Sequence, residues 1–235
     1  MSTTDSPRPG PVGRSSGADS TDANSIRRRL LDEAARVLAE RGPAALSARR
    51  LVREVGASTM AVYTHFGSMP ALVREVIREG FARFMERLKK VRTDDEDPVA
   101  ELFALCRVYR EFAVAEPHVY AVLFGGSGLA GFELDDSDRD MGVYVLRVPR
   151  DAIVRAMALG RFREADSWLV VRQLWCLLHG LSDLERTGYL RADHLGGGVG
   201  LGDFLELVLR DFAVGAGDTV EAATASLAES AGRNS

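Results

Sequence analysis

The sequence predicts an all-α protein, with an N-terminal three-helix unit that contains a helix-turn-helix and a larger C-terminal helical bundle. Apolar residues recur at three- and four-residue spacings through most of the chain, which is typical of amphipathic helices. Ser, Asp, Gly and Pro residues separate these segments where helices are expected to begin and end. No segment alternates apolar and polar residues as a half-buried strand does, so we expect no sheet.

The N-terminal helices follow a polar segment. Residues 1–24 hold almost no large apolar side chain, so we expect a disordered tail, because such a segment buries too little surface to offset its ordering entropy. Apolar spacing predicts a helix over 25–41, which Gly42 and Pro43 end. The next three helices are expected after serine N-caps, at residues 48–54, 59–65 and 69–91.

The rest of the chain is expected to form one helical domain over residues 92–215 and a flexible C-terminal tail over 216–235. The acidic run 93–98 indicates a linker or the start of a helix. A loop rich in Gly and Asp is expected over 125–140. The predicted helices of this domain are 99–115, 118–124, 141–158, 164–187 and 202–214.

The composition is that of a globular protein, with 46% hydrophobic and 27% charged residues in 235. No run of about 18 apolar residues predicts a membrane helix, and the first residues lack the apolar region of a secretory signal. Cys106 and Cys176 are the two cysteines, a count that disfavours a disulfide framework and a thiolate zinc site. We therefore expect a cytoplasmic protein with no metal and no cofactor.

The charge is distributed unevenly along the chain. Residues 25–92 hold 15 Lys and Arg against 7 Asp and Glu, whereas residues 93–235 carry a net charge of −11. A basic region joined to an acidic one suggests that the first contacts a polyanion. The alternative is that these charges are solvated and have no special role.

A helix-turn-helix accounts for the basic region. Residues 48–54 would form the supporting helix, Val55 and Gly56 the turn, and residues 59–65 the reading helix, which enters a DNA major groove about 12 Å wide. The small core that sets the angle between the two helices is expected from Leu51, Val55, Val62 and Phe66.

The expected DNA contacts lie at helix starts and on the free face of the reading helix. Unpaired backbone N–H groups at a helix start can hold a phosphate oxygen, and hydroxyl groups there add donors. Tyr63 and Phe66 have an alternative interpretation as core aromatics, and His65 lacks partners at metal-ligand spacing. The predicted contacts are Ser47, Arg49, Ser58, Thr59, Met60, Tyr63, Thr64, His65 and Ser68.

Residues 25–91 resemble the DNA-binding domain of the TetR family of bacterial transcriptional regulators. The resemblance is carried by Leu31-Asp32-Glu33-Ala34-Ala35, by Val55-Gly56-Ala57-Ser58 and above all by Val62-Tyr63-Thr64-His65-Phe66-Gly67. It implies that Ser47, Ser58, Thr59, Tyr63, Thr64 and His65 approach DNA. The family usually has Lys where this chain has Met69, so one phosphate contact is absent, and Arg74 or the helix N-terminus would compensate.

The resemblance also implies that the second domain is helical, binds a ligand and dimerises. Trp175-Cys176-Leu177-Leu178-His179-Gly180 resembles the Trp…His-Gly signature of one C-terminal subgroup, and the segment from Glu116 to Gly125 resembles its Pro-x-x-Tyr…Phe segment. A binding pocket needs apolar walls with few polar groups. The candidate walls are Phe103, Tyr109, Phe112, Tyr120, Phe124, Met157, Trp168, Trp175 and His179.

One alternative accompanies the candidate cavity walls, and a further set of residues is expected at a dimer interface. The aromatic residues of 164–187 have spacings that also suit an ordinary core, in which His179 is a structural, hydrogen-bonded histidine. The residues expected to pair with a second copy, in a dimer whose closing helices form a four-helix interface, are Leu174, Leu177, Leu181, Leu184, Phe204, Leu205, Leu207, Val208 and Phe212.

No catalytic motif is present. The sequence lacks G-x-S-x-G, a P-loop, H-E-x-x-H and C-x-x-C, and Gly125-Gly126-Ser127-Gly128 is better explained as a flexible connection than as a phosphate loop. The resemblance then implies a homodimeric repressor that binds a palindromic operator and leaves it when a small apolar or amphipathic molecule binds. The alternatives are an activator and a helical interaction protein that does not bind DNA.

Overall fold

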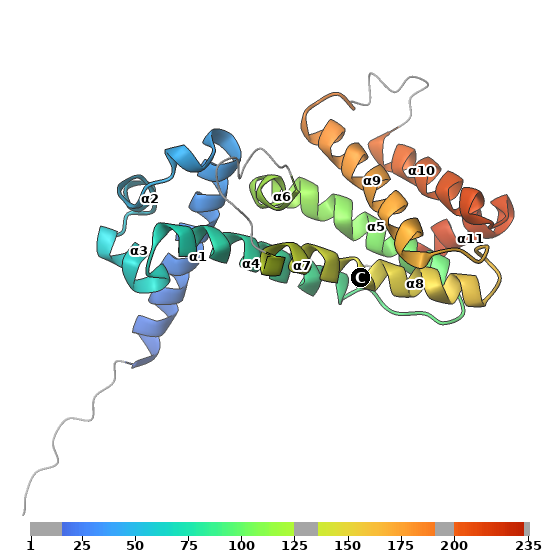
Figure 1. Cartoon of the computed structure of the whole chain (residues 1–235), viewed down its shortest axis with the longest axis horizontal. Coiled ribbons are helices and arrows are strands. Elements are labelled where there is room, and N and C mark those ends of the chain that lie inside the picture. The colour runs from blue at the N-terminus through green and yellow to red at the C-terminus, as the bar shows by residue number, and fades with distance from the viewer. Residues whose placement is uncertain (1–15, 125–135, 191–199, 233–235) are drawn as a thin grey trace, which may run out of the picture.

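The computed structural model describes residues 16–124, 136–190 and 200–232, and within these ranges every regular element is helical. This confirms the predicted all-α class. Figure 1 shows two parts side by side: α1, α2 and α3 form a head at one end, and α5, α8, α9, α10 and α11 form a body at the other. Helix α4 runs from the head into the body.

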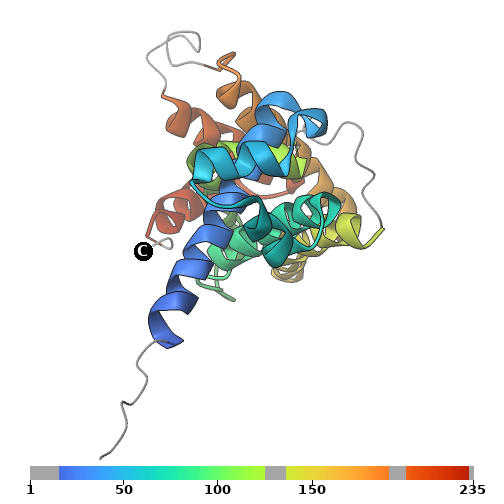
Figure 2. The ribbon, with the colours of Figure 1, turned by 90° about the vertical axis from the view of Figure 1, so that its left-hand side faces the viewer.

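The head begins with α1 (Ser16–Arg41), which starts well before the predicted position. The expected disordered tail 1–24 is therefore wrong for residues 16–24, while residues 1–15 lie outside the described residues. Polar residues add to an existing helix at little cost, because the expensive nucleating turn is already formed by the buried segment that begins at Leu30. Figure 2 shows this end of α1 extending away from the other helices.

The turns of the head lie at the predicted Gly, Pro and Ser residues. After α1, Gly42 leads into the short 3-10 turn η1 (Pro43–Ala45). Helix α2 (Ala48–Val55) ends at Gly56, whose φ of 71° is left-handed and favours glycine. Helices α3 (Thr59–Phe66) and α4 (Met69–Leu88) follow, each after a serine N-cap.

Helix α4 belongs to both parts. Its first turns pack Leu72 and Val76 in the core of the head, and its later turns bury Phe81 and Phe84 in the body. A Cβ at Gly80 would lie 2.8 Å from a side-chain carbon of Val119 in α6 (Pro117–Phe124). Only a residue without a side chain therefore allows α4 and α6 to approach this closely.

The body is built around α5 (Pro98–Ala115), which is buried along most of its length. One predicted helix, 141–158, proves to be two, because the chain turns at Leu146 between α7 (Asp136–Val145) and α8 (Arg147–Ala158). Helix α7 begins inside the predicted loop 125–140, whose first eleven residues lie outside the described ones. The other two predicted helices appear as α9 (Ser167–Arg186) and α10 (Leu201–Ala216).

The predicted flexible tail, 216–235, is wrong where the chain forms α11 (Val220–Ser230), which packs against α5. Small buried residues, Ala223 and Ser226 among them, allow the two helices to approach closely. Ser226 donates a hydrogen bond of 2.8 Å to Asp97, the N-cap of α5. The carboxylate of Asp218 is buried and receives two hydrogen bonds, of 2.8 and 2.6 Å, from the Arg161 guanidinium.

Candidate nucleic-acid interface and cavity

The angle between α2 and α3 is set by a small apolar core, as the sequence predicts. Leu51 and Val62 are fully buried, and Val55 is nearly so. Phe66 is only partly buried, and the Arg27 guanidinium of α1 lies 5.7 Å from the centre of its ring. Helix α3 is therefore held by one face and leaves its other face toward solvent.

The outer face of α3 carries most of the predicted contact residues. Met60 is 67% exposed and Tyr63 is 48% exposed. Thr59 and Thr64 are also exposed, whereas His65 is half-buried. Tyr63 is therefore not a core aromatic, and its hydroxyl and ring are free to contact a large partner.

Ser47, Ser58 and Ser68 serve as N-caps. Their hydroxyl oxygens accept hydrogen bonds from backbone N–H groups three residues ahead, at 3.4, 3.3 and 3.2 Å respectively. A serine hydroxyl that accepts in this way still has its own proton to donate. Because all three side chains are exposed, each can donate to a phosphate oxygen without losing its cap.

Cationic side chains surround this surface. Arg49 and Arg53 are exposed on α2, and Arg74 is exposed on the second turn of α4. Met69, at the start of α4, is half-buried and packs against the core. The position that the family fills with Lys is therefore used for packing in this chain.

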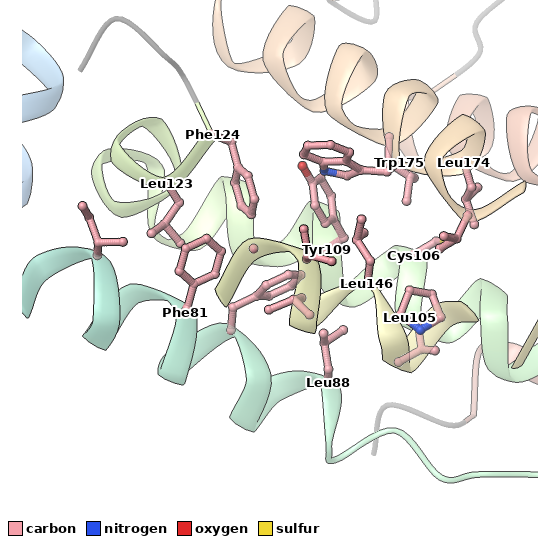
Figure 3. A pocket seen from close by; sticks show the side chains of 18 of the residues that line it. Phe81, Leu88, Leu105, Cys106, Tyr109, Leu123, Phe124, Leu146, Leu174 and Trp175 are labelled. Carbon is pink, nitrogen blue, oxygen red and sulfur yellow. The ribbon is translucent and has the colours of Figure 1, made fainter. Parts of the chain in front are cut away.

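The body holds a cavity of about 260 Å³ between α4, α5, α6, α7, α8 and α9 (Figure 3). Three predicted wall residues, Tyr109, Phe124 and Trp175, line it. Sequence reasoning missed the contribution of α4 and of the α7–α8 corner, because no local pattern shows that these segments meet. The lining residues it missed include Ile77, Phe81, Phe84, Leu88, Val143, Val145, Leu146 and Pro149.

The other predicted wall residues lie elsewhere, and four of them are away from the cavity. Phe103 is buried in the core, and Phe112 packs against Phe84 with ring centres 4.9 Å apart. Met157 lines a second hollow between α8, α9 and α10. The Arg150 guanidinium carbon lies 4.8 Å from the centre of the Trp168 ring.

Tyr120 and His179 form a hydrogen-bonded pair next to the cavity without lining it. The Tyr120 hydroxyl lies 2.8 Å from Nδ1 of His179. The Tyr109 hydroxyl lies 3.2 Å from that of Tyr120. The histidine is thus hydrogen-bonded, as in the structural interpretation, and it also connects to a cavity wall through the two tyrosines.

Aromatic rings and ion pairs connect the cavity with the head. Phe84 of α4 packs edge-on against Tyr109, with ring centres 5.6 Å apart. Arg83, one residue before it, pairs with Asp32 of α1 at 2.8 Å and with Glu116 at the end of α5 at 3.2 Å. Glu116 also pairs with Arg87. A displacement of α4 or α6 at the cavity would therefore act directly on α1.

The predicted pairing face on α9 and α10 is only partly available. Leu174, Leu181 and Leu205 are buried inside this chain and cannot contact a second copy. Leu177 and Leu184 on α9 and Leu207 on α10 are 39–45% exposed. Leu169, which sequence reasoning missed, is 54% exposed on the same helix as Leu177 and lines the second hollow with it. Phe204, Val208 and Phe212 are half-buried.

The described ranges hold neither a candidate membrane-spanning helix nor a metal-binding group. None of the helices there is both long enough and apolar enough to cross a membrane. No group of three His, Cys, Asp or Glu residues in those ranges is placed to hold a metal ion.

Two family models match the chain. Residues 30–76 match the model described as bacterial regulatory proteins, tetR family, and residues 102–212 match the tetracyclin repressor-like C-terminal domain. The HTH-type transcriptional regulator Rv1816 of Mycobacterium tuberculosis is 28% identical over 148 residues, which is 60% of this chain. The match spans 61% of that relative's length.

Solved structures share the fold. A TetR family transcriptional regulator, PfmR from Thermus thermophilus, superposes with a TM-score of 0.61 at 22% identity, over 77% of this chain and 97% of its own. A TetR transcription regulator from Haloarcula marismortui gives a TM-score of 0.63 at 22% identity, over 82% of this chain and 98% of its own.

Proposed function

The chain belongs to the TetR family of bacterial regulatory proteins, and on that premise we propose that it is a cytoplasmic, homodimeric, sequence-specific DNA-binding repressor. The observation that carries this proposal is the outer face of α3. This face exposes Met60, Tyr63 and Thr64 while Val62 on the opposite side is fully buried. A helix held in this way by one face suits insertion into a major groove.

In the proposed complex, α3 lies in the major groove and the helix starts fix its depth. Ser47, Ser58 and Ser68 donate their hydroxyl protons to phosphate oxygens, and Arg49 adds positive charge. Thr59, Met60, Tyr63, Thr64 and His65 face base edges or the sugar-phosphate backbone. Phosphate contacts fix register and orientation, and contacts to base edges read the sequence.

Dimerisation places two reading helices on one palindromic operator. Two half-sites lie about 34–36 Å apart, or a multiple of that, so the two copies must be held at a fixed distance. The exposed leucines Leu177, Leu184 and Leu207 support an interface on α9 and α10, because apolar side chains gathered on adjacent helices favour burial against a second copy.

Release of the operator would follow from occupation of the cavity by a small molecule. The cavity wall includes Phe81 and Phe84, so a ligand there contacts the helix that leads into the head. Displacement of α4 against α6 changes the distance between the two heads. By linkage, this ligand binds the free protein more tightly than the DNA-bound protein.

The test is a fluorescence-anisotropy titration of labelled DNA from the region upstream of the protein's own gene, at several salt concentrations. We expect saturable binding that exceeds binding to random DNA and weakens steeply as salt rises. Tyr63→Ala should weaken it about tenfold without changing the dimer. Tyr144→Ala, which removes a tyrosine of similar exposure from α7, is the matched control.

The outcomes separate the alternatives. No binding at low salt would contradict the proposal and favour a helical interaction protein. If the protein binds specifically and raises transcription from this operator in a transcription assay, the proposed role changes from repressor to activator. Equal effects of the two tyrosine substitutions would overturn the assignment of Tyr63 to the interface.

A further inference from the structure

The Tyr109 hydroxyl is a polar group at the wall of an otherwise apolar cavity. Among the described residues that line the cavity, none is charged, and only Tyr109, Trp175 and Cys106 have a polar side-chain atom. Figure 3 shows the hydroxyl of Tyr109 directed toward the indole of Trp175, with Phe124 and Phe81 on one side and Leu174 on the other. The side chains around it are aliphatic or aromatic.

This lining discriminates strongly against charge. An ion that enters loses its hydration, and the described wall offers it no counter-ion. Burying an unpaired charge is far more costly than burying a neutral polar group. Asp183 lies near the two tyrosines, but Arg186 pairs with it at 2.7 Å, so it offers no unpaired anion to a cationic ligand. Burial also raises the pKa of Tyr109, which keeps its hydroxyl protonated and neutral.

The Tyr109 hydroxyl makes only long contacts with Tyr120 and His179. The Tyr120 hydroxyl makes the short contact with His179, at 2.8 Å from Nδ1. Tyr109 is left with longer contacts, of 3.2 Å to the Tyr120 hydroxyl and 3.4 Å to the same nitrogen. Hydroxyl hydrogen bonds are usually about 2.7–2.8 Å long. An oxygen acceptor inside the cavity can therefore replace weak partners with a better one.

We propose that the effector is a small, uncharged, largely apolar molecule with one hydrogen-bond-accepting oxygen, which Tyr109 binds. This inference rests on the proposed function, because it names the chemistry of the molecule that releases the operator. It narrows the expected apolar or amphipathic effector by excluding ions. The cavity, about 260 Å³, lies just below the usual range of roughly 300–1,000 Å³, so the ligand is small.

Four compounds built on one ring system test the proposal by isothermal titration calorimetry of the full chain. They are 1-indanone, which has an acceptor oxygen, indane, which has none, the anion indane-1-carboxylate and the cation 1-aminoindane. We expect 1-indanone to bind most tightly. Indane should bind about tenfold more weakly, because it lacks the hydrogen bond. Neither ion should bind measurably at about 1 mM, because each would bury an unpaired charge.

The variant Tyr109→Phe removes only the hydroxyl. It should weaken 1-indanone about tenfold and leave indane unchanged, since indane makes no hydrogen bond. Tyr144→Phe, at an exposed tyrosine outside the cavity, should change neither. A circular dichroism spectrum and an unfolding curve for each variant confirm that it is folded.

Three results would overturn the inference: either ion binding as tightly as 1-indanone, Tyr109→Phe weakening both neutral compounds equally, or no neutral compound binding at 1 mM. The same preparations are titrated with DNA. If the ligand-free protein binds the operator but any of these three results is obtained, the proposed regulator stands and only the proposed class of effector is rejected. If the ligand-free, unmodified protein fails to bind the operator although 1-indanone binds as expected, the regulator is contradicted and the cavity chemistry stands.

Discussion

Polar side chains lie at the surface in the head and are buried beside the cavity in the body. In the head, polar groups lie outside: Ser47 and Ser58 cap helices at the surface, and Tyr63 stands on the outer face of α3. In the body, Tyr109 and Tyr120 are buried beside the cavity. The head is therefore suited to contact a large, solvated partner, whereas the body is suited to enclose a small one.

The charged groups differ in the same way. The pairs of the head, such as Glu75 with Arg78, lie on partly exposed helix surfaces. The body holds a partly buried cluster in which Arg161 contacts the buried Asp218 and the half-buried Asp97, and Ser226 donates to Asp97. This cluster joins the start of α5, the segment after α8 and helix α11. Ion pairs in the head thus lie at partly exposed surfaces, including the Arg27–Glu75 pair between α1 and α4, whereas the pairs of this cluster in the body gather around a buried carboxylate.

The largest effect is expected from breaking the cluster. Asp218→Ala should lower the free energy of unfolding by about 3 kcal/mol, because it leaves the partly buried Arg161 with its weaker partner. Urea denaturation measures the change. Asp211→Ala, which removes a 70% exposed carboxylate paired with Arg210, is the control and should change stability little. Similar losses for both would show that the cluster does not hold the body together.

The next effect concerns the second copy. Leu177→Glu places a charge on the exposed face of α9 and should raise the dimer dissociation constant at least thirtyfold, about 2 kcal/mol, without unfolding the chain. Sedimentation velocity measures it. Leu159→Glu changes a leucine of similar exposure after α8 and should leave the dimer intact. A Leu177→Glu protein that still dimerises would locate the interface elsewhere.

A smaller effect is expected where head and body meet. Gly80→Ala forces α4 away from Val119, and the overpacking, about 1–3 kcal/mol, is partly offset by the roughly 1 kcal/mol that alanine gains over glycine in a helix. The net loss should be about 1 kcal/mol, with altered operator affinity. Gly215→Ala, where a Cβ meets nothing, should instead stabilise α10. Stabilisation by both substitutions would show that the α4–α6 contact adapts freely.

The smallest effect is a dependence of stability on pH in the head. The Arg78 guanidinium, with Arg27, lowers the pKa of Glu75 from 4.5. A lowered folded-state pKa stabilises the fold above pH 4.5, and this stabilisation is lost as pH falls through the folded-state pKa. Glu75→Gln should therefore cost up to about 1 kcal/mol at pH 7 and progressively less as the pH falls below 4.5, in urea titrations. A difference independent of pH would assign the loss to packing.

Glu86→Gln is the control for that titration. Glu86 also pairs with a cation, Lys89, but both side chains are more than 60% exposed. Its substitution should change stability less than that of Glu75 at pH 7.

The head could be predicted from the sequence because its determinants are local. Serine caps, Gly56 and the spacing of Leu51, Val55 and Val62 act within a few residues of one another, and each lies where the pattern predicts. The exposure of Tyr63 agrees with its predicted place on the free face of α3, but the local pattern left the alternative of a core aromatic open. A tyrosine suits both a core and a surface, and only the packing of α3 against its neighbours distinguishes the two.

The helical class, most helix boundaries and the position of α3 follow from the sequence alone, because capping and apolar periodicity are properties of short segments. The cavity wall depends on the tertiary structure, since Phe84, Leu146 and Trp175 come from segments far apart in the chain. The order of α11 depends on the tertiary structure as well. A segment of small, polar residues gains its stability from the surface it buries and from partners such as Asp97, and neither is visible in the segment's own sequence.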